Sequence, residues 1–218
     1  MLSKRLLIIS RYINDDDIVA DIGTDSGQLP FYLAKNGHKY VYASDNKKGP
    51  YDNLVKKISE NNLENIIETK LEDGLNNLPS NVNTVVIAGM GGELIRSILI
   101  EGREYLFTIK KLILAPNCQE PTVRRTLMEL GFGIIEEEVI KDGRHYYEII
   151  VAIPKISPLT PAEIEFGPIN LQKKSSIFKE KWAKAYLANA RLLQKDDLPP
   201  YRRIEIMQIQ ERIKEING

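Results

Sequence analysis

Residues 18–33, IVADIGTDSGQLPFYL, decide the fold of this chain. They begin as an apolar strand pattern, pass through a turn rich in Asp and Gly, and continue as a helical pattern. Parallel-sheet enzymes bind nucleotides at such junctions, where a strand ends and a helix begins. The glycines stand at Gly23 and Gly27, which is not the G-x-G-x-x-G order of a dinucleotide site. The stretch therefore predicts a nucleotide-like ligand of another kind.

The alternation of strand and helix patterns continues beyond this junction. It predicts an α/β fold with a mostly parallel sheet and right-handed crossovers. A final pair of strand patterns turns at Asp142-Gly143, and such a hairpin requires at least one antiparallel strand. The predicted strands lie within residues 17–23, 40–45, 66–74, 82–92, 111–117 and the hairpin 133–155.

The C-terminal part has a different pattern. Residues 153–168 contain four prolines and predict a linker, after which two helical stretches predict an antiparallel hairpin. We expect a first domain at 1–155 and a helical hairpin at 156–218. Each helix has an apolar face, the second at coiled-coil spacing, which we expect to be the packing seam of the hairpin itself. These faces hold Phe178, Trp182, Ala185, Asn189 and Leu192 in one helix and Ile206, Ile209, Ile213 and Ile216 in the other.

Composition and charge limit the classes of protein. No apolar run is long enough to cross a bilayer, residues 1–10 lack a following cleavage site, and no cluster has metal-ligand spacing. The single cysteine, Cys118, excludes an internal disulfide and fits a cytoplasmic protein. Overall charge is balanced, but residues 173–218 carry eleven Lys and Arg against six Asp and Glu. This basic tail suits a polyanionic partner or is simply a solvated surface.

Polar or small residues follow five predicted strands in turn. The residues at these positions are Asp21 with Gly23, Asp45, Asp73-Gly74, residues 88–92 and Pro116-Asn117. One such residue could be a helix cap, whereas five consecutive strand ends favour a ligand site.

The charges of the first turn restrict the ligand. Asp21 and Asp25 flank Gly23 and would repel a phosphate group, and a Walker lysine is missing. Asp45 stands about twenty residues further on, where an acid accepts hydrogen bonds from ribose hydroxyls. A cationic nucleoside without phosphate fits best, and S-adenosylmethionine is such a ligand.

Several segments then resemble one family. They are LSKRL at 2–6, ADIGTD at 20–25 with LP at 29–30, KGPY at 48–51, IAGMGG at 87–92, PN at 116–117, LGF at 130–132, YYEIIV at 146–151 and FGP at 166–168. In this order they resemble the TrmK family, bacterial tRNA (adenine-N1)-methyltransferases that act at position 22.

The resemblance implies a class I methyltransferase (Rossmann-like) fold, with a mostly parallel seven-stranded sheet and a C-terminal α-helical coiled-coil hairpin. It implies S-adenosylmethionine as cofactor and tRNA as substrate. By position, the cofactor residues are Asp21, Gly23, Thr24, Asp45, Asp73, Gly74, Ala88, Gly89 and Met90. Asp45 stands where the family usually has Glu, and Asp73 where it often has Asn.

The chain departs from the family inside the first turn. The family usually has Asp-His-Ala-Tyr, whereas this chain has Asp25-Ser26-Gly27-Gln28. The family's Tyr is a natural stacking platform for a target base, while Gln28 can only hydrogen-bond to one. Two alternatives to a tRNA adenine methyltransferase therefore stay open. One is a methyltransferase of the same fold that acts on another RNA base or on a small molecule, and the other is a non-catalytic protein that binds the cofactor or RNA.

Methylation of adenine N1 asks little of acid–base chemistry. The ring nitrogen has a free lone pair, so catalysis can rest on placing the reacting atoms in line, with the base exposed or flipped out. The candidate positioning residues are Asn117, which could also be a helix cap, Asp25 and Gln28.

The tRNA would meet basic residues at both ends of the chain. Contacts with phosphates position an RNA without specifying its sequence. We expect a monomer or a weak homodimer. The predicted RNA contacts are Lys4, Arg5, Arg11, Lys173, Lys174 and Lys181, with Lys179 and Lys184 as further tail lysines.

Overall fold

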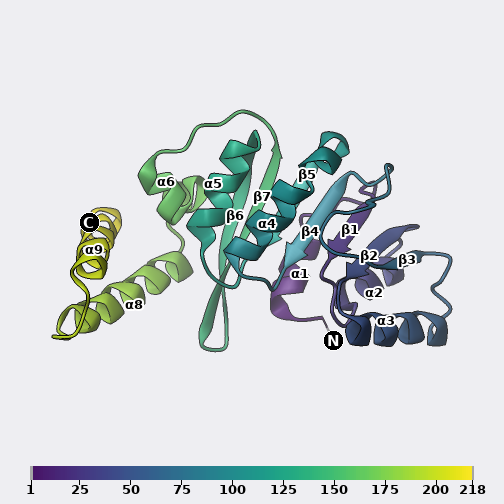
Figure 1. Ribbon diagram of the computed structural model, residues 1–218, viewed down its shortest axis with the longest axis horizontal. Helices are drawn as coiled ribbons and strands as arrows, with labels where there is room; N and C mark the ends of the chain where they lie inside the picture. The colour runs from purple at the N-terminus through teal and green to yellow at the C-terminus, as the bar shows by residue number, and fades with distance from the viewer. Residues whose placement is uncertain (1, 218) are drawn as a thin grey trace.

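A computed structural model describes residues 2–217 and shows one seven-stranded sheet between two layers of helices (Figure 1). The strand order is β3-β2-β1-β4-β5-β7-β6, and β7 runs in the opposite direction to the other six strands. The predicted mostly parallel sheet is confirmed. The strands are β1 Val19–Ile22, β2 Val41–Asp45, β3 Ile67–Leu71, β4 Thr84–Ala88, β5 Lys111–Ala115, β6 Phe132–Asp142 and β7 His145–Pro154.

Helices cover both faces of the sheet. One layer holds α1 (Lys4–Ser10), α2 (Gln28–Lys35) and α3 (Lys48–Glu60). The other holds α4 (Gly92–Glu101), the 3₁₀ helix η1 (Arg103–Thr108) and α5 (Glu120–Glu129).

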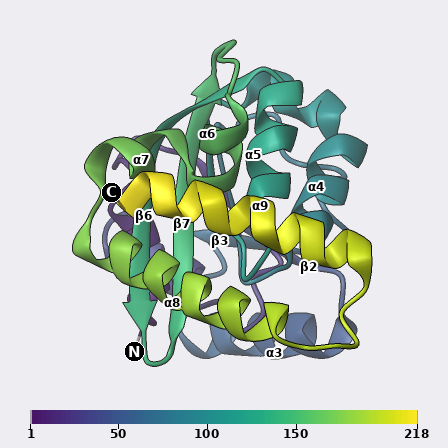
Figure 2. The same cartoon turned by 90° about the vertical axis from the view of Figure 1, so that its left-hand side faces the viewer.

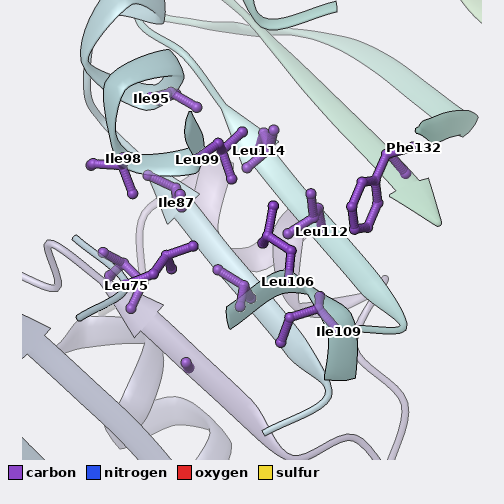
Figure 3. Close-up of a cluster of buried hydrophobic side chains, with 14 of the residues drawn as sticks. Leu75, Ile87, Ile95, Ile98, Leu99, Leu106, Ile109, Leu112, Leu114 and Phe132 are labelled. Atoms are coloured by element: carbon purple, nitrogen blue, oxygen red, sulfur yellow. The ribbon is translucent and has the colours of Figure 1, made fainter. Parts of the chain in front are cut away.

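The central strands are apolar on both faces because both faces are covered. Val86 of β4 packs in the layer of α1 and α2, whereas the next residue, Ile87, packs against α4. Figure 3 shows Ile87 with Leu114 of β5 and with Leu99 of α4 in the second layer. The near-continuous Val and Ile runs of the sequence therefore encode the middle layer of the fold.

The predicted hairpin is confirmed. β6 and β7 pair antiparallel up to Asp142 and His145, and Gly143 in the turn has a φ of +58°. The pairing register shifts between Ile134 and Glu136, which marks a β-bulge. Because β7 is inserted between β5 and β6, the hairpin forms the outer part of the sheet.

The predicted linker contains one short helix, and a second begins at its last residue; neither was predicted from the sequence. They are α6 (Pro161–Phe166) and α7 (Pro168–Lys173). The Thr160 hydroxyl accepts a hydrogen bond from the main chain of Glu163, whose carboxylate accepts one from the main chain of Thr160. This capping box, with Pro161 at the first helical position, is the sequence signal that was missed.

The last two helices, α8 (Ser176–Leu193) and α9 (Pro200–Asn217), lie side by side beyond β6 and β7 (Figure 2). The helical hairpin is confirmed, while its supercoiling stays a prediction. We had expected the apolar faces of these two helices to pack only against each other, but they also pack against the rest of the protein. Trp182 packs edge-on against Phe166 of α6 at a centroid distance of 4.6 Å, and the same cluster holds Val139 of β6 and Ile213 of α9.

Within residues 2–217, no helix combines the length and the apolar character needed to cross a membrane. The same part of the chain contains no group of three or more His, Cys, Asp or Glu side chains placed to hold a metal ion.

Candidate active site

A cavity of about 600 Å³ lies where the parallel strands end. Its lining brings together all nine residues predicted to bind the cofactor. It also includes Asp25, Gln28 and Arg5, whereas Asn117 lies at its edge through a hydrogen bond to Arg5. The nine residues are Asp21, Gly23, Thr24, Asp45, Asp73, Gly74, Ala88, Gly89 and Met90.

Asp21 is a buried acid in the wall of this cavity. Its residue is 5% exposed, and within residues 2–217 it forms no ion pair with Lys, Arg or His. Burial raises the pKa of Asp21 to about 6, with the side chain of Thr24 acting in the opposite direction and the charge of nearby Asp45 in the same one. A cation beside this carboxylate would relieve the cost of its burial, so the cavity is suited to a positively charged ligand.

Asp45 ends β2 and has a fixed orientation. One of its carboxylate oxygens accepts a hydrogen bond from the main-chain N–H of Asp25 (3.1 Å) and the other from that of Lys47 (2.9 Å). A carboxylate offers about four acceptor positions, so each oxygen can still accept from a ligand hydroxyl. This geometry suits a ribose diol.

The turn after β1 requires its glycine. Gly23 has a φ of +71°, and a Cβ at this position would stand 1.9 Å from Cε of Met90. The N–H groups of Gly23 and Thr24 both donate to the carbonyl of Ser44, at 2.8 and 3.0 Å. The loop is thus tied to β2, and Met90 from the β4 loop closes over it.

The far side of the cavity combines a polar and an apolar wall. Asp73 accepts a hydrogen bond from the side chain of Asn46 at 3.0 Å. Leu94 and Ile98 of α4 line the same cavity, and Leu94 is 52% exposed. An apolar surface beside a hydrogen-bond acceptor fits an adenine ring, whose faces are apolar and whose amino group donates.

Asn117 and Arg5 form a connected group at the cavity edge. Arg5 Nη1 donates to Asn117 Oδ1 at 2.7 Å, and Asn117 Nδ2 donates to the carbonyl of Gly89 at 2.6 Å. The main-chain N–H of Asn117 donates to the carbonyl of Met90 at 2.7 Å. The guanidinium of Arg5 also lies 4.7 Å from the ring centre of Tyr147. Asn117 therefore holds the loop after β4 in place, rather than projecting a free amide.

Comparisons with known proteins agree with this geometry. Residues 2–150 match the model of a family described as "Methyltransferase domain". The tRNA (adenine(22)-N(1))-methyltransferase of Bacillus subtilis is 30% identical over 190 residues, which cover 83% of this chain and 79% of that protein.

Two solved structures extend the similarity over the whole chain. A candidate tRNA (m1A22) methyltransferase of Streptococcus pneumoniae in complex with S-adenosyl-L-methionine has a TM-score of 0.93 and 31% identity, and covers 100% of both chains. TrmK of M. capricolum in complex with S-adenosyl-homocysteine has a TM-score of 0.85 and 30% identity, covering 100% of this chain and 96% of the other.

This chain belongs to the TrmK family. Membership agrees with the class I methyltransferase fold, whose sheet and flanking helices are those described above.

Gln28, the main departure from the TrmK pattern, has hydrogen-bond partners inside the chain. Its Oε1 accepts from the main-chain N–H of Ser3 and its Nε2 donates to the hydroxyl of Ser26, both at 3.3 Å. Asp25 beside it is exposed and has a φ of +50°, which an Asp tolerates better than most residues. Both bonds of Gln28 are long, so its amide remains available to a ligand at the cavity mouth.

The basic residues predicted to contact RNA fall into different places. Arg5 lies in the site itself, and Lys4 donates to the carbonyl of Lys141 at 2.7 Å. Arg11 and Lys174 are exposed, while Lys173 pairs with Glu136 at 2.5 Å. The structure thus keeps an exposed basic surface but does not gather these residues around the cavity.

Lys181 corrects one of these predictions. Its side chain is only 16% exposed, and its ammonium pairs with Glu120 at 2.6 Å and with Glu148 at 2.5 Å. Arg124, which is fully buried, pairs with Glu148 and with Glu137 and donates to the carbonyls of Ile164 and Glu165. We call Arg124, Glu137, Glu148 and Lys181 the arginine cluster. Lys181 thus joins α8 to the sheet and is not presented to an RNA.

The roles of Arg5 and Tyr147 were missed by sequence reasoning. Arg5 was assigned to RNA phosphates because it lies in a basic N-terminal stretch. The available signal was that LSKRL and YYEIIV are both family motifs, one at each end of the methyltransferase domain.

Proposed function

We propose that this protein is an S-adenosylmethionine-dependent tRNA (adenine(22)-N1)-methyltransferase. The observation that carries the proposal is the cavity at the strand ends, where a fixed Asp45 and a buried Asp21, which has no cationic partner among residues 2–217, line the same space. The relative from Bacillus subtilis has this activity in its name, and the solved relatives are bound to the cofactor or to its product.

The residues of the cavity fit the cofactor part by part. Asp21 suits its positive charges, Asp45 its ribose hydroxyls, and Asp73 with Leu94 and Ile98 its adenine. S-adenosylmethionine supplies a methyl group on a positively charged sulfur. Because adenine N1 needs no deprotonation, the protein has only to hold the base in line and exclude water.

Arg5 and Asn117 serve this positioning. They hold the loop of Gly89 and Met90, which forms one wall of the cavity, against α1 and β7. Asp25 and Gln28 line the same cavity and are the groups that could contact the target base.

We further propose the roles of the two parts of the chain. Residues 1–155 bind the cofactor and carry out the transfer, and residues 156–218 add basic surface that contacts the body of the tRNA. We expect the protein to act in the cytoplasm, where tRNA is modified, as a monomer or a weak homodimer.

Incubation with tRNA tests the proposal. The purified protein, with S-adenosylmethionine, is given an unmodified tRNA transcript with adenine at position 22 and a matched transcript with guanine there. Nucleoside mass spectrometry should find N1-methyladenosine in the first transcript only, and Asp21→Asn should lose at least 90% of the product. Methylation of both transcripts would point to another base, and methylation of neither would favour a small-molecule acceptor or a non-catalytic role.

A further inference from the structure

A second cavity, of about 410 Å³, adjoins the first on the outer side of α2. The two cavities share Ser26 and Gln28, so Gln28 stands between them. The other residues that line it had no role predicted from the sequence. They are Leu2, Phe31, Tyr32, Lys35, Asn36, Lys57 and Asn61.

The two cavities differ in charge. The lining of the first carries five acidic residues against two basic ones, which suits a cation. The lining of the second carries Lys35 and Lys57 and no acid. Within residues 2–217, neither ammonium group has an ion-pair or hydrogen-bond partner. Two free ammonium groups beside one cavity suit a ligand with phosphate groups.

The second cavity also offers an aromatic surface. Phe31 and Tyr32 are half-buried, and Phe31 packs against Leu54 and Ile58 of α3, which holds its ring in place. A ring held by packing can stack on a base with little loss of side-chain entropy.

Two amides can bind the edge of a base. Asn36 Nδ2 donates to the carbonyl of Tyr32 at 2.7 Å, and Asn61 Nδ2 donates to that of Lys57 at 2.8 Å. These bonds orient the amides and leave each Oδ1 as an acceptor on an exposed side chain.

We propose that the second cavity binds the nucleotide of the tRNA that adjoins the methylated adenosine. Its base lies on Phe31 and Tyr32, and the phosphates on either side of it pair with Lys35 and Lys57. Gln28 separates this nucleotide from the adenine that enters the first cavity. This proposal rests on the proposed function, and it assigns the substrate's approach to α2 and α3.

A double charge reversal tests the two lysines. Lys35→Glu with Lys57→Glu should raise the Kd and the KM for tRNA at least tenfold, with the affinity for S-adenosylmethionine unchanged. The slope of log Kd against log salt should fall by about 1.5, because two phosphate contacts are lost. The matched control reverses Lys39 and Lys56, which are exposed on the same two-helix region but do not line the cavity, and should change Kd less than threefold. An equal effect of both double variants, or no effect of the first, would overturn the proposal.

Phe31→Leu tests the stacking surface. Leucine keeps the packing against Leu54 but has no flat ring, so Kd for tRNA should rise about fivefold or more at an unchanged melting temperature. An unchanged Kd in this folded variant would contradict the stacking role. The tRNA affinity is measured by filter binding without turnover. A wild-type protein that binds tRNA through Lys35 and Lys57 but yields no N1-methyladenosine would therefore refute the proposed function and leave the second cavity supported.

Discussion

Two buried acids, Asp21 and Glu148, stand in opposite electrostatic surroundings. Glu148 is fully buried in the arginine cluster, where the charges of Arg124 and Lys181 outweigh the burial and hold its pKa below the ordinary value. Asp21 is buried and has no cationic partner in the part of the chain that the structure describes, so burial raises its pKa to about 6. Glu148 connects elements of the protein through its ion pairs, whereas Asp21 lines a cavity and can pair with a cationic ligand. Of these two buried acids, Asp21 is therefore the one whose surroundings suit a charged ligand.

The largest expected effect is the loss of the arginine cluster. Arg124→Met keeps the apolar volume but leaves Glu137 and Glu148 buried without the guanidinium, which should cost about 3–5 kcal/mol of unfolding free energy. Urea denaturation at pH 7.5 measures this loss. The control is Arg125→Met at the exposed neighbouring position, whose unfolding free energy should stay within about 0.5 kcal/mol of wild type, as is usual for surface substitutions. A loss as small in Arg124→Met as in the control would show that the cluster adds nothing to stability.

A substitution of Asp21 should change the unfolding free energy in the opposite direction, and make the protein more stable. Because its folded pKa lies above the ordinary value of 3.8, its charged form lowers the unfolding free energy, by up to about 3 kcal/mol at pH 8. The contribution of Asp21 to the unfolding free energy is most favourable below about pH 4, where its carboxyl is protonated in both states, and it falls as the pH rises to about 6. Asp21→Asn should therefore be about 1–3 kcal/mol more stable than wild type at pH 8 and equal to it at pH 4, while binding the cofactor only weakly. Urea denaturation at both values checks it, and a less stable variant at pH 8 would contradict the raised pKa.

The smallest effect concerns ligand affinity. If the charged form of Asp21 binds the cationic cofactor, the affinity for S-adenosylmethionine should rise about tenfold between pH 5 and pH 7, as the carboxyl with a pKa of about 6 ionises. Calorimetry at several pH values measures this change. Asp21→Asn should bind weakly with no dependence in this range, and an equal dependence in the variant would assign the titration to another group.

The sequence predicted well whatever depends on local pattern. The strand ends with their Asp and Gly residues were recognisable because each lies within a few residues of an apolar run, and parallel strands necessarily bring those ends together. This pattern indicated a ligand site at the strand ends, whereas the nine individual cofactor residues were predicted from the resemblance to the TrmK family, and all nine line the cavity there. The hairpin at residues 133–155 was recognisable from its alternation and from Gly143.

Contacts between distant segments could not be predicted in the same way. In the sequence, Lys181 cannot be distinguished from the other lysines of its basic helix. Its burial follows from ion pairs with Glu120 and Glu148, which are distant in the sequence. Arg5 lies 112 residues before Asn117, and its role depends on how α1 packs beside β7. Lys35 and Lys57 belong to different helices, so the cavity that they share has no signature in the sequence.

The arginine cluster also has a consequence for the order in which the protein is made. Arg124, Glu137 and Glu148 are synthesised with the methyltransferase domain, whereas the carbonyls of Ile164 and Glu165 and the ammonium of Lys181 come later. At about 5–20 residues per second, the ribosome needs roughly 2–7 s to pass from Glu148 to Lys181, which is 33 residues later. During that interval Glu148 has been synthesised and its partner Lys181 has not. The outer end of the sheet is therefore the part of the enzyme that is completed last.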